Sequence, residues 1–364
     1  MPNTVLPGTY ITVRDEGLIS VGGVSTGNIG IVGSALAGDA NKVYILSSFT
    51  DAKDAFAPKP DQKIAATQTA TLLKAVELLY ANGASTVYAV RASDETPKGY
   101  AAALELLANE TVNLVLLAGQ DATKGEMVDA LKAHLALTEV SHRERIGLVG
   151  CNGSVDPAQI IATQDKLVHD GGRLIYVAPG VSLTKRDPAK GSESTEVLSG
   201  AFTAAAVAGL ISTLPVQVSP TNKTLNLSGL AVRFNHGQLE QLVQANVLTV
   251  EQRQGLRVVK GVTTSTNNAW SQITTRRIVD YAIYGVRAAC NPYIGKLNNL
   301  RVRGAMKATL DGLLTRMVEN EALIGYQLEV SATRAQEIAG QAIVNMTLQP
   351  TFSIDYVMVT MSLG

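Results

Sequence analysis

The sequence predicts an α/β protein whose larger part is a mostly parallel sheet flanked by helices. Two observations predict this class. Strand and helix patterns alternate from residue 85 to residue 180, an order typical of a parallel sheet covered on both faces. The chain has 364 residues and is 46% hydrophobic, which suits about two domains and provides enough apolar side chains for a real core.

The first half of the chain contains the alternating elements. The apolar or alternating runs that predict strands are residues 10–14, 29–33, 42–46, 86–90, 112–117, 146–149 and 173–177. The segments with helical apolar spacing are residues 48–56, 67–80, 100–107, 124–137 and 158–169. The second of these helices is followed by Asn82-Gly83, a good C-terminal signal.

The second half is less regular. Residues 184–195 are polar and contain Pro188 and Gly191, so we expect an exposed loop there. The alanine-rich residues 196–210 predict a tightly packed helix, and the two prolines within residues 213–227 exclude regular structure. Further helices are expected at residues 238–245, 275–289 and 302–319, and extended segments at residue 248 and residues 256–262, 327–331, 342–348 and 352–363.

Both ends of the chain predict strands that lack a partner. The last extended segment reaches the terminus without a polar tail, and an apolar free strand exposes hydrogen-bonding edges unless something pairs with it. We expect these strands either to pair within the chain or to add to a neighbouring subunit's sheet. The residues that carry this prediction are Tyr10, Ile11, Thr12 and Val13 at the N-terminus and Phe352, Ile354, Tyr356 and Met358 at the C-terminus.

Composition excludes several classes of protein. The formal net charge is zero, which favours self-association and argues against nucleic acid as the main partner. The N-terminal residues lack the pattern of a targeting segment, and no apolar run reaches the roughly 18 residues that a membrane helix needs. We therefore expect a protein that is assembled in the cytoplasm without inserting into a membrane.

No motif in the chain indicates catalysis, a metal or a cofactor. Gly30 and Gly33 do not complete a nucleotide-binding fingerprint, and no phosphate-binding loop or nucleophile elbow is present. Cys151 and Cys290 form neither a disulfide framework nor a metal-binding pattern with the four histidines. An α/β enzyme with a doubly wound sheet would explain the alternating elements but not the extended termini, and it remains the alternative.

One stretch carries an unusual charge. Residues 271–310 hold seven basic residues against a single acid, Asp280, a local charge of +6 in a neutral chain. A solvated helix face is the usual explanation of such a run, but the local lack of acids better fits a surface that meets an acidic partner. The basic residues are Arg276, Arg277, Arg287, Lys296, Arg301, Arg303 and Lys307.

Several motifs, in order along nearly the whole chain, resemble the contractile phage tail sheath family. The clearest is residues 80–91, YANGASTVYAVR, which is similar to that family's helix–turn–strand. The others are PGTYI (7–11), GVST (23–26), GIVG (30–33), AAVAGL (205–210), SPTN (219–222), TRRI (275–278) and NMTLQP (345–350) with the final strand.

The resemblance implies a structural subunit that polymerises helically around an inner tube and contracts to drive it through a cell envelope. It implies an N-terminal arm (1–17), an outer α/β domain (18–265), an inner α+β domain facing the tube (266–350) and a C-terminal arm (351–364), with the inner sheet completed by strands from neighbouring subunits. The tube contacts would then be Arg276, Arg277, Arg287 and Lys296.

The partners that the resemblance implies are copies of the chain, the tail tube, the baseplate and the tail terminator, in a virion tail, with no cofactor. A different tail subunit, such as the tube or the baseplate, is a second alternative. The sequence does not distinguish a phage from a bacteriocin or another injection system.

Overall fold

The computed structural model describes residues 26–58, 70–153, 156–186 and 193–362. The chain divides into two compact units: the larger comprises Ser25–Tyr281 and the residues from Pro350 onward, and the smaller includes Ala282–Gln349. The predicted N-terminal arm, with Tyr10, Ile11, Thr12 and Val13, lies outside the described residues.

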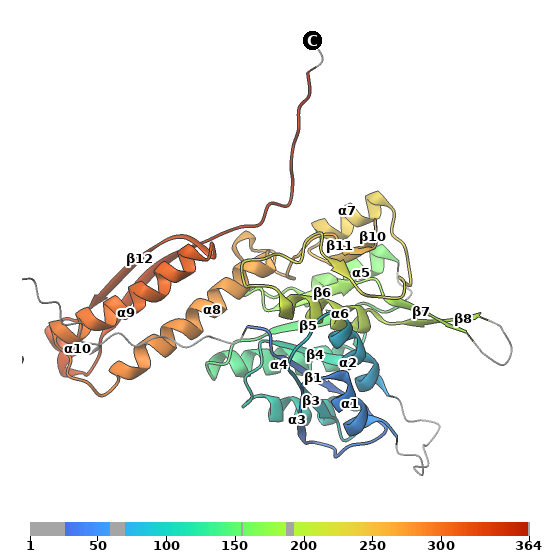
Figure 1. The fold of residues 1–364 in the computed structure, drawn as a ribbon, viewed down its shortest axis with the longest axis horizontal. Helices are drawn as coiled ribbons and strands as arrows, with labels where there is room; N and C mark the ends of the chain where they lie inside the picture. The colour runs from blue at the N-terminus through green and yellow to red at the C-terminus, as the bar shows by residue number, and fades with distance from the viewer. Residues whose placement is uncertain (1–25, 59–69, 154–155, 187–192, 363–364) are drawn as a thin grey trace, which may run out of the picture. The chain divides into compact units, whose positions relative to one another are not determined.

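The larger unit is built on a nine-stranded sheet (Figure 1), and this sheet is mostly parallel, as predicted. The central strands are parallel, and antiparallel pairs occur only toward its two ends. The order across the sheet is β2 (Val43–Leu46), β3 (Val87–Arg91), β1 (Ile29–Gly33), β4 (Leu114–Asp121), β5 (Ile146–Gly150), β6 (Leu174–Ala178), β10 (Leu248–Gln252), β11 (Leu256–Val258) and β9 (Thr224–Leu225).

Helices cover both faces of this sheet. Along β4, Leu114 and Leu116 belong to one cluster of buried side chains, and Val115 and Leu117 belong to the other. Alternating side chains of a strand point to opposite faces, so neither face is left to solvent. One face is covered by α1 (Phe49–Phe56), α2 (Thr71–Ala81) and α6 (Gly200–Thr213), and the other by α3 (Pro97–Leu107), α4 (Gly125–Val140), α5 (Pro157–Leu167) and α7 (His236–Gln244).

Local sequence signals set the ends of these helices. Ser48 and Asp51 form a reciprocal capping box at the start of α1. Thr96 caps α3, whose first residue is Pro97, at the position where a missing N–H costs nothing. After α2 the chain turns at Gly83 with φ +96°, a conformation that favours glycine.

Helix α6 lies directly against the sheet. A Cβ atom on Gly150, at the end of β5, would collide with the backbone of Gly200 at the start of α6. Nearly every residue of the helix is buried, and most are alanine, glycine or threonine. Small side chains let the helix backbone approach the strands, which accounts for the alanine-rich run.

The predicted loop at residues 184–195 is wrong in part. Strands β7 (Val181–Arg186) and β8 (Glu193–Leu198) pair antiparallel and form a hairpin that extends away from the sheet (Figure 1). The predicted helix at 196–210 accordingly begins four residues later, at Gly200. The polar composition suggested a loop, but cross-strand hydrogen bonds overrode it.

The smaller unit packs a helix on a short sheet. Helix α9 (Leu300–Glu319) lies along the two-stranded sheet of β12 (Leu323–Ser331) and β13 (Ile343–Pro350), whose strands are joined through α10 (Arg334–Ile338). Its buried side chains include Leu310, Leu313, Leu314, Met317 and Leu323.

Helix α8 (Ile273–Cys290), preceded by the short η1 (Asn268–Trp270) and followed by η2 (Asn291–Tyr293), runs from one unit into the other. The boundary between the units, between Tyr281 and Ala282, therefore falls inside α8.

Candidate assembly surfaces

The C-terminal segment, residues 351–362, has no strand or helix in the described chain. The strand predicted at 352–363 therefore has no strand partner among the described residues. Its apolar side chains face solvent, and Met358 is 96% exposed. A run of exposed apolar residues in extended backbone marks a surface for another chain. The other exposed members are Phe352, Ile354, Tyr356, Val357, Val359 and Met361.

The sheet of the smaller unit is unfinished. Only β12 and β13 form it among the described residues, so each has one edge without a strand partner there. A two-stranded sheet is marginally stable alone, and its free backbone N–H and C=O groups are a template for further strands. This sheet can therefore accept an extended segment on either edge.

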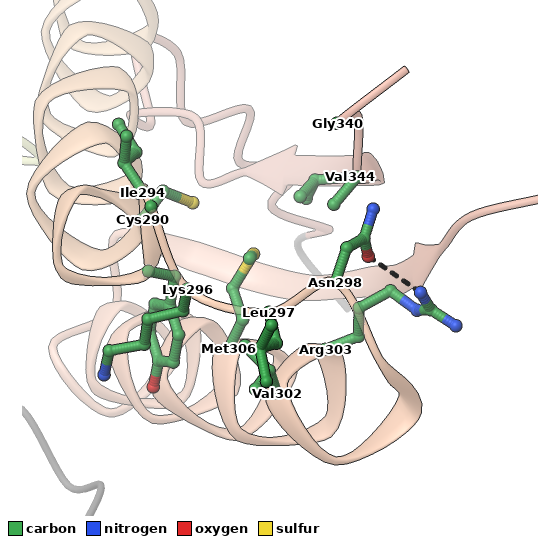
Figure 2. A pocket seen from close by; sticks show the side chains of 13 residues that line it. Cys290, Ile294, Lys296, Leu297, Asn298, Val302, Arg303, Met306, Gly340 and Val344 are labelled. Carbon is green, nitrogen blue, oxygen red and sulfur yellow. Dashed lines mark hydrogen bonds between the residues drawn. The ribbon is translucent and has the colours of Figure 1, made fainter. Parts of the chain in front are cut away.

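The connection between α8 and α9 exposes a second group of apolar side chains. Ile294 and Leu297 are each 78% exposed, and Leu300 is 82% exposed. Ile294 and Leu297 border a pocket of about 280 Å³ whose wall also includes Cys290 and Met306 (Figure 2). We call residues 294–300 the apolar loop. This surface was not predicted from the sequence, although three large apolar residues among glycine, asparagine and lysine are a readable signal.

Polar contacts hold the apolar loop in place. Arg303, which is buried, donates to Asn298 Oδ1 at 2.8 Å (Figure 2). It also donates to Glu337 Oε1 at 2.9 Å. Asn298 Nδ2 in turn donates to the carbonyl of Gln341 at 2.9 Å. Arg334 and Arg303 lower the pKa of Glu337, so this carboxylate is charged at neutral pH. The exposed apolar side chains are thus presented by a fixed backbone.

The basic residues of the stretch 271–310 divide between surface and interior. Lys296, Arg301 and Lys307 are exposed, and Lys296 also lies over the ring of Tyr293 at 5.0 Å. Arg287 is half-buried, with its guanidinium 5.9 Å from the ring centre of Tyr284.

The expected exposure of Arg276 and Arg277 is wrong. They are 4% and 5% exposed, and both are held inside the larger unit. Arg277 donates to the carbonyls of Leu214 and Pro215 just past the end of α6, at 2.8 and 3.1 Å. A guanidinium there complements the helix dipole and satisfies terminal carbonyls. Burial lowers the pKa of Arg277 to about 10, which still leaves it charged near neutral pH.

Arg276 belongs to a buried ionic cluster with Asp280 and Arg173. Asp280 accepts from Arg276 Nη2 at 2.7 Å and from both terminal nitrogens of Arg173 at 3.1 and 3.2 Å. The guanidinium of Arg276 also stacks over Trp270, 4.4 Å from the ring centre. These contacts fix the first half of α8 to the larger unit, which accounts for a unit boundary inside this helix.

Two absences apply to the described residues. No group of three metal-ligating side chains occurs among residues 26–58, 70–153, 156–186 and 193–362. In the same part of the chain, no helix is long and apolar enough to cross a membrane.

Among the described residues, the α/β body carries an exposed apolar segment, a two-stranded sheet with free edges and an exposed apolar loop, which are features typical of a structural assembly subunit. Comparison with known families identifies which kind. The chain matches the phage tail sheath protein central domain over residues 93–264 and the phage tail sheath C-terminal domain over residues 265–364. The protein belongs to the phage tail sheath family, which confirms the resemblance seen in the sequence.

Solved structures agree on the fold. The helical sheath of the anti-feeding prophage in its contracted state superposes with a TM-score of 0.76 at 20% identity, over 99% of each chain. The contracted sheath complex of the extracellular contractile injection system PVC gives 0.73 at 14% identity, over 100% of this chain and 98% of that one. The sheath tail protein of Desulfitobacterium hafniense gives 0.65 at 14% identity, over 94% and 100%. No curated protein sequence matches.

Proposed function

We propose that this chain polymerises with copies of itself into a helical sheath around an inner tube, and that the sheath contracts to drive the tube through a cell envelope. Family membership supports the sheath role, and two similar structures are described as sheaths in a contracted state. Contacts between unlike surfaces of identical subunits generate such open helices.

The observation that carries the proposal is the match between a donor and an acceptor. Residues 357–362 have no helix or strand and carry four exposed apolar side chains, Val357, Met358, Val359 and Met361, and the sheet of β12 and β13 has free edges among the described residues. Each backbone hydrogen bond formed between copies would contribute about 0.5–1.5 kcal/mol. About five such bonds, with the apolar side chains, make a connection that survives a large rearrangement of the subunit bodies.

Deletion of residues 357–364 tests the donated strand. We expect a protein that folds with an unchanged far-ultraviolet circular dichroism spectrum but forms no hollow cylinders in negative-stain electron microscopy. The full chain under the same conditions should form them. Cylinders of normal length from the truncated chain would rule out strand donation at this end.

We further propose that the exposed basic residues of the smaller unit meet an acidic tube. Lys296, Arg301 and Lys307 replace the buried Arg276 and Arg277 in this role, with Arg287 beside them. Exposed charge pairs are weak and are screened by salt, so such contacts can release when the sheath contracts. A baseplate partner is also proposed, since one structure with the same fold is the baseplate of the anti-feeding prophage, at 18% identity and a TM-score of 0.73.

Charge reversal tests the tube surface. The triple variant K296E/R301E/K307E should fold but fail to assemble on its tube. The matched control, K98E/K124E/K166E, reverses three exposed lysines of the larger unit and should assemble normally. Equal assembly of the two variants would refute the tube contact.

A further inference from the structure

The first residues of the C-terminal segment, 351–356, which we call its root, are attached to the larger unit through one buried carboxylate. The residues on either side, Ile354 and Tyr356, are 82% and 70% exposed, whereas the side chain of Asp355 is only 9% exposed. An acidic side chain is seldom this buried unless it is paired. Exposure alternates along residues 351–356, and the less exposed side of this alternation, which includes Ser353 and Asp355, is held by the protein surface behind it.

Gln272 holds this root with both ends of its side-chain amide. Its Nε2 donates to Asp355 Oδ2 at 3.1 Å, and its Oε1 accepts from the backbone N–H of Ser353 at 3.2 Å. Gln272 itself is fixed, because it lies in an antiparallel bridge with Val262 and directly precedes α8. One side chain therefore fixes both the backbone and the carboxylate of the segment.

Lys260 also contacts the carboxylate of Asp355. Its Nζ lies 3.5 Å from Asp355 Oδ2 and 5.1 Å from the ring centre of Tyr356. Thr221, whose hydroxyl also accepts from the backbone N–H of Gly261 at 3.0 Å, reaches Asp355 Oδ1 at 3.5 Å. Hydrogen bonds to a charged group are stronger than those between neutral groups, so the contacts of the Asp355 carboxylate form a specific attachment point. We call Gln272, Lys260 and Asp355 the latch.

We propose that the latch fastens the C-terminal segment to its own subunit at Asp355, so that only the residues beyond Tyr356 can add to a neighbouring copy. This inference rests on the proposed strand donation. A fixed root shortens the free segment, which raises its effective concentration at a neighbour and fixes the register of the donated strand. Asp355 and Gln272 are thus positioning residues for assembly.

Hydrogen exchange on the unpolymerised full chain tests the latch without any polymer. The variant Q272E keeps the size of the side chain but places a second carboxylate against Asp355. We expect exchange in peptides spanning residues 351–356 to accelerate about tenfold, the change expected when one hydrogen bond to a charged group is lost. The control D165A removes an exposed carboxylate of the larger unit and should leave this exchange unchanged.

A double variant separates the latch from general damage. In Q272E/D355N the donor and acceptor are exchanged, because the new amide at position 355 can donate to the new carboxylate at position 272, so protection should return toward the wild-type value. Exchange in Q272E equal to that in D165A would overturn the latch, and so would a double variant as fast as Q272E.

Assembly provides the second readout. Q272E should raise the protein concentration needed for polymerisation about tenfold, and the double variant should reverse this change. The chain lacking residues 357–364 should keep a protected root although it does not polymerise. If that truncated chain polymerises normally, the strand donation fails while the latch stands. If Q272E exchanges like the control, the latch fails while the strand donation stands.

Discussion

The main sheets of the two units differ in the number of their strands and in the length of their edge strands. The sheet of the larger unit has nine strands, helices on both faces and edge strands of only four and two residues, β2 and β9. The sheet of the smaller unit has two strands of nine and eight residues with free edges among the described residues. Short edges discourage pairing and long ones invite it. We therefore expect stability to reside mainly in the larger unit, and the proposed assembly contacts to lie in the smaller unit and the C-terminal segment.

The basic residues show the same difference. In the larger unit, Arg276 and Arg277 donate their hydrogen bonds to Asp280 and to the carbonyls that end α6. In the smaller unit, Lys296 and Arg301 face solvent. Substitution of the buried Arg276 and Arg277 should therefore change the free energy of unfolding, while substitution of the exposed Lys296 and Arg301 should change assembly alone. Trp270, the sole tryptophan of the chain, lies in the larger unit and reports on its unfolding.

The largest effect is expected from Asp280→Ala. The change leaves Arg173 and Arg276 buried without their shared carboxylate, and breaking a buried ion pair from one side costs about 3–5 kcal/mol. Urea denaturation followed by Trp270 fluorescence should show this loss. The exposed carboxylate variant Asp165→Ala is the control and should match the wild type. An unchanged midpoint for Asp280→Ala would show that the cluster does not hold α8 to the larger unit.

A pH-dependent loss of stability is expected from His134, which is 4% exposed and lies 2.9 Å from Arg145. Burial, and the charge on Arg145, lower the pKa of His134 from 6.5 to about 3. As the pH falls below 6.5, the unfolded chain binds a proton at this residue and the folded chain does not. The stabilising difference is therefore complete above pH 6.5 and declines toward pH 3, by about 2–3 kcal/mol between pH 6.5 and 4.5.

The variant His134→Gln isolates this contribution, since the glutamine oxygen can still accept from Arg145 but does not titrate. Urea midpoints measured from about pH 7.5 to pH 4.5 should fall less steeply for the variant than for the wild type. Parallel curves would mean that carboxylates alone set the acid sensitivity.

The sequence predicted the larger unit far better than the surfaces. The apolar spacing of each strand and helix, and helix-end signals such as Asn82-Gly83, involve residues close together in the sequence. Such local patterns determine the type and order of the elements. Burial of a charge is not local: Arg276 and Arg277 look like a basic helix face until Arg173 and the end of α6 are brought beside them by the fold. The latch between Gln272 and Asp355 joins positions 83 residues apart, and no spacing rule reveals it.

A smaller effect on unfolding is expected at the capping box of α1. Ser48→Ala removes the side-chain acceptor for the backbone N–H of Asp51, which costs about 1 kcal/mol. The neighbouring Ser47→Ala is the matched control, because the Ser47 side chain is exposed and only its backbone N–H binds Asp51. Thermal unfolding should separate the two variants by a few degrees. Equal melting temperatures would show that α1 frays without affecting the sheet beneath it.

The smallest effect on unfolding, and the sharpest test of the comparison, is expected from Leu297→Ser in the apolar loop. Leu297 is 78% exposed, so its replacement removes little buried surface and should change the free energy of unfolding by less than about 0.5 kcal/mol. Assembly should nevertheless weaken, because an exposed apolar side chain on a fixed backbone is what a protein partner buries. Sedimentation of polymers against protein concentration measures this, with Leu137→Ser, an exposed leucine of the larger unit, as the control. If both variants polymerise alike, the apolar loop is not an assembly surface, and the unfinished sheet and the C-terminal segment carry that role alone.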